Sequence, residues 1–385
     1  MTIIKRFKEF LHLSFLYSRR TISEVNRWRA VQSNNPLKPL VFYGHERIPS
    51  RSERSGGAMI KFQDLDEYFP NTVRGANILY LVNSALPVFP EIMARRAKQK
   101  GVLLVLNQNG VAYPGWHGPG WEKTNAPNRI LLELADFVIY QSEFCKQTAD
   151  KFVARCKCQW TISHNPVNTE VFRPGGITCP WGVRLLLSGS HQHFYRIQTA
   201  LETLQKILMY EPNAFLTIAG RYTWRAVEKE CIAEVERMAQ ELGVQQRFEF
   251  SGGYSQEEAP ALLQKHNILL HTKFNDPCPR LVAEAMACGL PIVYSKSGGV
   301  PELVGKNAGV GVPTILDWQQ DHPPKSDELA RAALQVYEGL ETYSLAARSR
   351  AVNNLDVLPW IKMHSAIFAD LLNRNKNAPN EFKAA

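Results

Sequence analysis

Several signals that would narrow the function are missing from this chain of 385 residues. No apolar run approaches the roughly 20 residues needed to cross a bilayer. The seven cysteines are an odd number and include no Cys-x-x-Cys pair; the closest two are Cys156 and Cys158. A disulfide framework or a zinc site is therefore not expected, and the chain is predicted to be cytoplasmic with reduced thiols.

Other fingerprints are also missing. The segments "GSHQHF" and "GHERIP" lack the Gly-x-Gly-x-x-Gly pattern, which argues against a dehydrogenase. The sequence contains no basic helix with interleaved aromatic residues, which is the pattern that would suggest nucleic-acid binding. The sequence shows no strong pairing of a nucleophile with a base, and nothing in it requires a bound metal or a cofactor.

The composition indicates a two-domain protein with an anionic partner. A chain of 385 residues is too long for one ordinary core, and 45% of it is apolar. The net charge of +9 is moderate. It fits an anionic ligand and an anionic membrane surface equally well.

The N-terminal stretch "MTIIKRFKEFLHLSFLYSRR" is both basic and apolar. His12 and Ser14 interrupt it and no cleavage site follows, so a signal peptide is not expected. A helix here would group apolar side chains between basic flanks: Ile3, Ile4, Phe7, Phe10 and Leu11, with Lys5, Lys8, Arg19 and Arg20. Two interpretations stay open. The helix lies on the inner face of the cytoplasmic membrane, or it packs on the first domain.

Strand-like and helix-like segments alternate along the chain, which predicts an α/β fold with two doubly wound parallel sheets. Residues 109–128, rich in Gly, Pro and Trp, are expected to form a long loop. The predicted units begin with a basic amphipathic N-terminal segment (residues 1–37), a first domain (38–165) and a linker (166–180). A second domain (181–352), a helix that crosses back to the first domain (353–375) and a tail (376–385) follow.

The stretch from Asn275 to Glu302 carries the clearest chemistry. Asp276 and Glu284 stand eight positions apart, around a Pro-Cys-Pro-Arg turn that opens a helix near Leu281. The end of that helix favours a phosphate, and a carboxylate can accept the two hydroxyl protons of a ribose. The alternative is structural: Arg280 and Glu284 are an i,i+4 pair, and Asp276 can simply form a turn.

These residues resemble the family 4 glycosyltransferases of the GT-B fold. The similarity lies in the spacing of the two acids, followed by "EAMACGLPIV" and "SGGVPELV". It extends to "LADFVIYQSEFCKQTADKF", the linker "ISHNPVNTEVFRPG", "LTIAGRY" and the crossing helix "PWIKMHSAIFADLL". Together these motifs cover roughly residues 38–375.

The resemblance implies roles for individual residues. Glu284 matches the acid that binds the donor ribose, and Asp276 stands where a glutamate is usual. Gly56 and Gly57 match the pair that lets the backbone approach a diphosphate; the alternative is a flexible hinge. The implied nucleotide-sugar site further includes the turn residues Cys278 and Leu281, and the later pair Gly298 and Gly299, which otherwise would only form a tight turn.

Two positions depart from the family pattern. Ser190 replaces a diphosphate-binding arginine and Tyr195 a lysine, so the positive charge is expected from Arg196, Arg221 or Arg280.

On the acceptor side, Asn107 or Asn109 stands where relatives carry a histidine, and Asn109 is taken as the candidate. His117 is more simply a solvated loop residue. Trp116 and Trp121 could stack on a sugar or serve as packing anchors.

The resemblance implies transfer of a sugar from a UDP- or GDP-sugar to a glycan or lipid-linked acceptor, with retention of anomeric configuration, in cell-surface polysaccharide or glycoconjugate synthesis. The chain is expected to make peripheral contact with a membrane, and it is not expected to bind nucleic acid. Two rival hypotheses remain: another GT-B enzyme such as a sugar-nucleotide epimerase, and an inactive scaffold.

Overall fold

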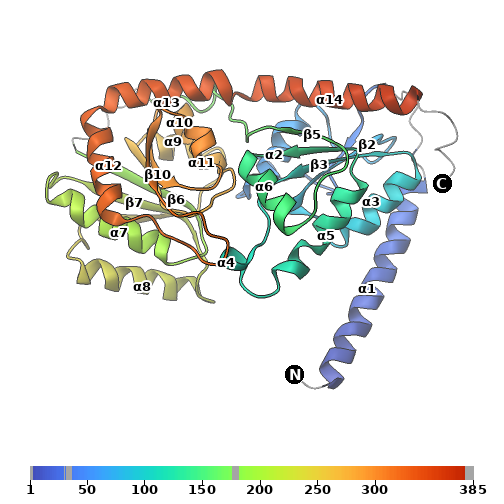
Figure 1. Ribbon diagram of the computed structural model, residues 1–385, viewed down its shortest axis with the longest axis horizontal. Coiled ribbons are helices and arrows are strands. Elements are labelled where there is room, and N and C mark those ends of the chain that lie inside the picture. Colours follow the sequence, from blue (N-terminus) through green and yellow to red (C-terminus); the bar gives the residue numbers. More distant parts are fainter. Residues whose placement is uncertain (1–2, 30, 32–36, 176–181, 378–385) are drawn as a thin grey trace.

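The computed structural model describes residues 3–29, 31, 37–175 and 182–377. Two parallel sheets lie side by side, and two long C-terminal helices run along both of them (Figure 1). The predicted α/β fold of two Rossmann-like domains is confirmed. The last part of the predicted linker, residues 176–180, falls outside the described residues.

The first domain contains a five-stranded parallel sheet whose described strands lie in chain order. They are β1 (Val41–Phe42), β2 (Ile78–Val82), β3 (Leu103–Gln108), β4 (Phe137–Tyr140) and β5 (Gln159–Ile162). One face packs on helices α3 (Pro90–Gln99), α5 (Trp121–Leu134) and α6 (Glu143–Phe152). The other face packs on α2 (Gly57–Asp66) and α14 (Val357–Asn377). Apolar side chains therefore fill both sides of the sheet, as buried parallel strands require.

The second domain contains a six-stranded parallel sheet in the order β11-β10-β9-β6-β7-β8. Its strands are β6 (Arg184–His191), β7 (Phe215–Tyr222), β8 (Phe248–Gly252), β9 (Ile268–His271), β10 (Ile292–Lys296) and β11 (Gly309–Pro313). The chain winds outward from β6 to β8 and then returns to place β9 on the other side of β6. This reversal is a topological switch point, where open α/β sheets bind ligands at the carboxyl ends of their strands.

The prediction of one long loop at residues 109–128 is wrong. The short helix α4 (Pro114–His117) lies there, and α5 begins at Trp121 and continues through Pro127. The Asn125 side chain bonds both the N–H and the carbonyl of Ala112, at 3.0 and 2.8 Å. These tertiary contacts hold a turn of helix that its internal proline would otherwise disfavour.

Helix α1 (Ile3–Arg29) packs on the first domain through its C-terminal part. Trp28 is buried against Phe42, and its indole nitrogen donates to the buried carboxylate of Glu24. Phe15 and Ile22, in contrast, are exposed. The side chains of residues 3–14, on which the amphipathic pattern rests, are outside the described set. Within the described residues, no helix is both long and apolar enough to cross a membrane.

Helices α13 (Leu340–Asn354) and α14 connect the two domains along one side of the molecule (Figure 1). Trp360 and Phe368 of α14 lie in the core of the first domain. The bridge between Val167 and Asp356 joins the linker to the start of α14.

Candidate functional site

A cleft of about 730 Å³ separates the two domains at the carboxyl ends of their strands. Most of the residues predicted from the sequence line it. They are Gly56, Gly57, Asn109, Ser190, Arg196, Arg221, Asp276, Arg280, Leu281 and Glu284. Cys278, Gly298 and Gly299 do not line it, so the structure does not bring the whole predicted set to one surface.

Gly298 and Gly299 support the loop that carries Asp276. A Cβ atom at Gly298 would lie 2.3 Å from the Asp276 carbonyl oxygen, and one at Gly299 would lie 2.0 Å from the Pro277 carbonyl oxygen. The Gly299 N–H donates to the Asp276 carbonyl at 2.9 Å. Asn275 has a left-handed φ of 49°, which asparagine tolerates better than most residues. These backbone contacts fix the direction in which Asp276 points.

Asp276 faces two basic side chains. Its Oδ2 atom lies 3.3 Å from Lys273 Nζ and 3.3 Å from His271 Nε2. Burial raises the pKa of Asp276, but Lys273 and His271 outweigh that effect and lower it overall. The carboxylate is therefore ionised at neutral pH and can accept a hydroxyl proton. Sequence reasoning missed Lys273 and His271, although both lie within five positions of Asp276.

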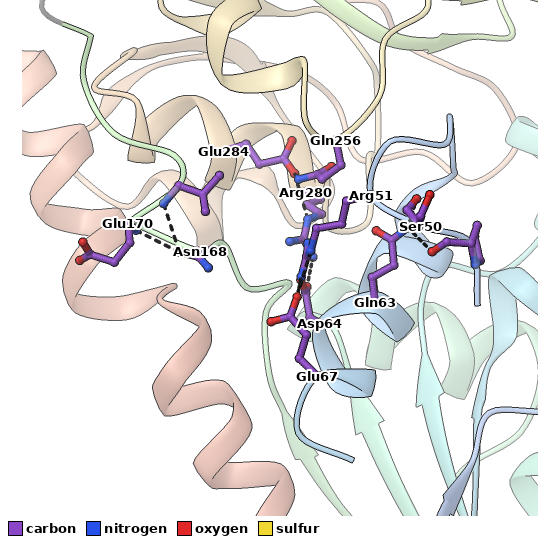
Figure 2. Close-up of polar contacts among 12 residues, drawn as sticks. Ser50, Arg51, Gln63, Asp64, Glu67, Asn168, Glu170, Gln256, Arg280 and Glu284 are labelled. Carbon is purple, nitrogen blue, oxygen red and sulfur yellow. Dashed lines mark hydrogen bonds and ion pairs between the residues drawn. The ribbon is translucent and has the colours of Figure 1, made fainter. Parts of the chain in front are cut away.

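Glu284 lies one turn into α10 (Arg280–Ala287), and only 5% of it is exposed. Its Oε1 atom accepts from Arg280 Nε at 2.9 Å and from Gln256 Nε2 at 2.8 Å (Figure 2). Among the described residues, no hydrogen bond reaches Oε2. The i,i+4 pair and a cleft-facing carboxylate therefore coexist, because the pair uses only one oxygen.

Two arginines flank the position of Ser190. Arg196 is buried, and its guanidinium donates to the carbonyl oxygens of Ser190 and Ser188, at 2.6 and 3.3 Å. Arg221 is exposed and reaches Ser190 Oγ at 3.3 Å. Burial lowers the pKa of Arg196. Lys273 and Arg280 also line the cleft, and each forms an ion pair with an acid.

Gly56 and Gly57 lie at the start of α2 on the opposite wall. A Cβ atom at either position would have nothing within 4 Å. Packing inside the protein therefore does not require glycine there, whereas it does at Gly298 and Gly299. Open space at a helix start in a cleft is what an approaching anionic ligand would need.

The first-domain wall of the cleft is nearly uncharged. Asn109 lies on it, with its Nδ2 atom 3.4 Å from Ser84 Oγ. Asn107 is buried below, where it binds Lys61 and Tyr80, and does not line the cleft. Trp116 lines the cleft, and Trp121 packs against Phe152 instead.

One Asp-x-Asp triplet, Asp64 to Asp66, is present in α2, but its two acids have separate partners. Asp64 binds arginines, and Asp66 accepts from the backbone N–H of Asn71 at 2.6 Å. No group of three or more potential metal ligands is found in the part of the chain that the structure describes.

Comparisons with known proteins find similar sequences and similar folds. Residues 184–321 match the family model described as Glycosyl transferases group 1. The chain is 23% identical over 270 residues to the phosphatidylinositol N-acetylglucosaminyltransferase gpi3 subunit of Schizosaccharomyces pombe, covering 65% of this chain and 57% of that protein. It is 37% identical over 70 residues to the MMP alpha-(1->4)-mannosyltransferase of Mycolicibacterium hassiacum, covering 18% of this chain and 17% of that one. The matches thus span about half or less of these curated relatives.

Solved structures share the fold. Anabaena HepE in complex with UDP and glucose superposes with a TM-score of 0.62 at 18% identity, covering 77% of this chain and 78% of that one. Sucrose-phosphate synthase from Thermosynechococcus elongatus gives a TM-score of 0.60 at 18% identity, covering 81% and 78%.

Proposed function

We propose that this chain, whose residues 184–321 form a glycosyl transferases group 1 domain, transfers a sugar from a nucleotide-sugar to a glycan or lipid-linked acceptor. One observation carries the proposal: the two predicted acids, Asp276 and Glu284, line the same cleft as the glycine pair Gly56 and Gly57 from the other domain. A site assembled from both domains can hold two substrates across the gap.

The donor would bind mainly to the second domain. Glu284 has an oxygen available for the ribose hydroxyls, and the diphosphate would lie near Arg196, Arg221 and Lys273. Anabaena HepE was solved with UDP and with UDP-glucose, which favours a UDP-sugar as the first donor to try. No metal or cofactor is part of the proposal.

The proposed chemistry retains the configuration at the anomeric carbon. The bond from that carbon to the phosphate oxygen breaks, and the acceptor oxygen forms its bond on the same face. The acceptor proton passes to the departing diphosphate. Lysine and arginine side chains stabilise the negative charge that develops on this leaving group, so the protein need not supply a nucleophile.

The acceptor side supports a neutral, hydroxyl-bearing substrate. Most first-domain residues that line the cleft carry amides, hydroxyls or aromatic rings, a few are aliphatic or glycine, and Arg54 is the one charged side chain among them. The polar and aromatic set is Ser55, Asn83, Ser84, Asn109, Tyr113, Trp116, Thr124, Asn125, Asn128 and Phe144. The buried Asn128 Oδ1 has no hydrogen-bond partner among the described residues. A sugar hydroxyl would satisfy it.

We further propose that the chain works in the cytoplasm and touches the inner face of the cytoplasmic membrane through α1. The exposed residues Phe15, Arg19 and Ile22 share one helical face, three and four positions apart. An apolar and basic face of this kind suits an anionic lipid surface. Deleting residues 1–20 should release the protein from phosphatidylglycerol-containing vesicles in a sedimentation assay; unchanged sedimentation would reject this role.

A donor-hydrolysis screen tests the proposed activity without knowledge of the acceptor. The full chain is incubated with UDP- and GDP-sugars, and release of the nucleoside diphosphate is measured. Release from one donor class, absent in Glu284→Gln, is expected. A chain that neither binds nor hydrolyses any nucleotide-sugar would instead be an inactive scaffold, and a product with an inverted sugar centre would indicate an epimerase.

A further inference from the structure

A network of buried ion pairs connects the first domain to Glu284 in the second. Arg280 donates through Nε to Glu284 and through Nη1 to Asp64 Oδ2, at 2.9 and 2.5 Å (Figure 2). Asp64 lies on α2, and its side chain is 1% exposed; that of Arg280 is 6% exposed. The two residues are 216 positions apart in the chain. One guanidinium therefore joins an acid from each domain.

The first-domain end of this network is also held in place. Arg51 Nη2 donates to Asp64 Oδ1 at 3.0 Å and to the half-exposed Glu67 at 2.6 Å. Each carboxylate oxygen of Asp64 thus accepts a hydrogen bond from a different arginine. Burial lowers the pKa of Arg280, but Asp64 and Glu284 outweigh that effect and raise it. The guanidinium remains charged between its two acids.

The geometry points to Asp64 as a positioning residue for the donor site. By drawing Nη1 toward the first domain, Asp64 orients the Arg280 guanidinium so that only Nε faces Glu284. Glu284 then uses Oε1 for Arg280 and Gln256 and keeps Oε2 for the ligand. The Nη2 atom of Arg280, on the same edge of the guanidinium as Nε, is buried and has no hydrogen-bond partner among the described residues. Without Asp64, Arg280 would be free to turn this edge fully to Glu284 and occupy both oxygens, as arginine–carboxylate pairs commonly do.

This inference rests on the proposed function and adds to it. A residue of the first domain would set the affinity of the second domain for the nucleotide. Because the Asp64–Arg280 pair joins the two domains, ribose binding and the domain arrangement that brings these residues together would stabilise each other. An ion pair that only held the domains together would weaken binding only by opening them, so its loss would enlarge the radius of gyration as well. If Asp64 acts on Glu284, Asp64→Asn should weaken binding while the radius of gyration stays that of the wild type.

The test is calorimetric titration of the full chain with UDP and GDP, using whichever binds the wild type more tightly. Asp64→Asn keeps the shape of the side chain and removes its charge. We expect its dissociation constant to rise at least about fivefold, the lower end of typical coupling between two sites. Asp64→Glu, which keeps the charge, should lie between Asp64→Asn and the wild type in its affinity for the nucleotide.

Glu67→Gln is the matched control, because it changes the same network two ion pairs further from Arg280 than Asp64 is. Its affinity should equal that of the wild type. In an Arg280→Met background, Asp64→Asn should cause no further loss, since Asp64 acts through Arg280. Unchanged affinity in Asp64→Asn, or an equal additional loss in the Arg280→Met background, would overturn the inference. If the wild type binds neither nucleotide, the proposed function itself fails.

Discussion

The carboxylate of Glu302 in the second domain accepts a 2.8 Å hydrogen bond from the backbone N–H of Glu143 in the first domain. A second bond, from the N–H of Phe144, is 3.1 Å long. Glu302 lies in α11 (Val300–Val304) and satisfies free N–H groups in the first turn of α6. Burial raises the pKa of Glu302, but its bonds with His164, Glu143 and Phe144 lower it overall. An acid of one domain thus caps a helix of the other.

Removing this cap should favour an open arrangement of the domains. Glu302→Ala leaves two helix N–H groups without their acceptor, at a cost of about 1.5–3 kcal/mol per charged bond. We expect a larger radius of gyration in small-angle X-ray scattering and a weaker affinity for UDP. Glu241→Ala, at an exposed position in α8 (Glu228–Glu241), should change neither. An unchanged radius in Glu302→Ala would show that the cap does not hold the domains together.

The two glycine pairs should respond differently to alanine. At Gly299 the new methyl group would collide with the Pro277 carbonyl, so Gly299→Ala should distort the Asp276 loop and lower the melting temperature. At Gly57 the methyl group meets only open space. Gly57→Ala should keep the wild-type melting temperature and bind UDP more weakly. Equal affinity in Gly57→Ala would remove this pair from the proposed diphosphate site.

Arg221 allows a test of the substituted diphosphate site, because it is exposed and its loss should not disturb the fold. Arg221→Ala should lower the rate of donor turnover about 10-fold to 100-fold, as loss of a charge-assisted bond to a leaving group does. Arg225→Ala, four residues away, is the control, because Arg225 pairs with Glu234 and does not line the cleft. Equal rates in the two variants would place the phosphate elsewhere.

Lys61 predicts a specific pH dependence of stability. Burial lowers its pKa from 10.5 to about 7. Between these values the unfolded chain binds about one more proton at this site than the folded one, so stability should rise with pH across this window. Lys61→Met removes that contribution and leaves Gln141 as a donor to Asn107.

Urea unfolding between pH 6 and 10 measures this effect. Lys61→Met should be more stable than the wild type near pH 6 and 7, and the difference should shrink toward pH 10. For Lys229→Met, at an exposed position, the difference in unfolding free energy from the wild type should stay the same at every pH. A Lys61→Met curve parallel to that of the wild type would mean that Lys61 keeps an ordinary pKa in the folded protein.

The sequence was most informative where function depends on a local motif. The acid pair, the turn before α10 and the glycine pair at α2 stand at recognisable spacings, and the fold brings Asp276, Glu284 and Gly57 to one cleft. The sequence also predicted Arg196 as a substitute cation, one position after Tyr195; Arg196 lines the cleft, and its role stays a prediction.

Other features depend on contacts that no local pattern reveals. Asp64 looks like an ordinary surface acid of an amphipathic helix until the fold brings Arg280 beside it. Helix α5 contains Pro127, which reads as a loop signal, and β11 is a short strand with two glycines. Helices α12 (Ser326–Glu338) and α13 follow a turn-rich segment and were likewise not predicted. At Pro127 and in β11, tertiary packing overrides local preference. Helices α12 and α13 consist largely of good helix formers, so their local preference agrees with the fold.

In the proposed donor site, Glu284 binds the pentose of a nucleotide in the cleft. Calorimetric titration of UDP into the wild type and into Glu284→Gln measures this contact, with circular dichroism to verify that the variant is folded. The wild type should bind UDP, and the folded variant should bind it at least about tenfold more weakly, equivalent to about 1.4 kcal/mol. If both proteins bind UDP equally well, Glu284 does not hold the pentose.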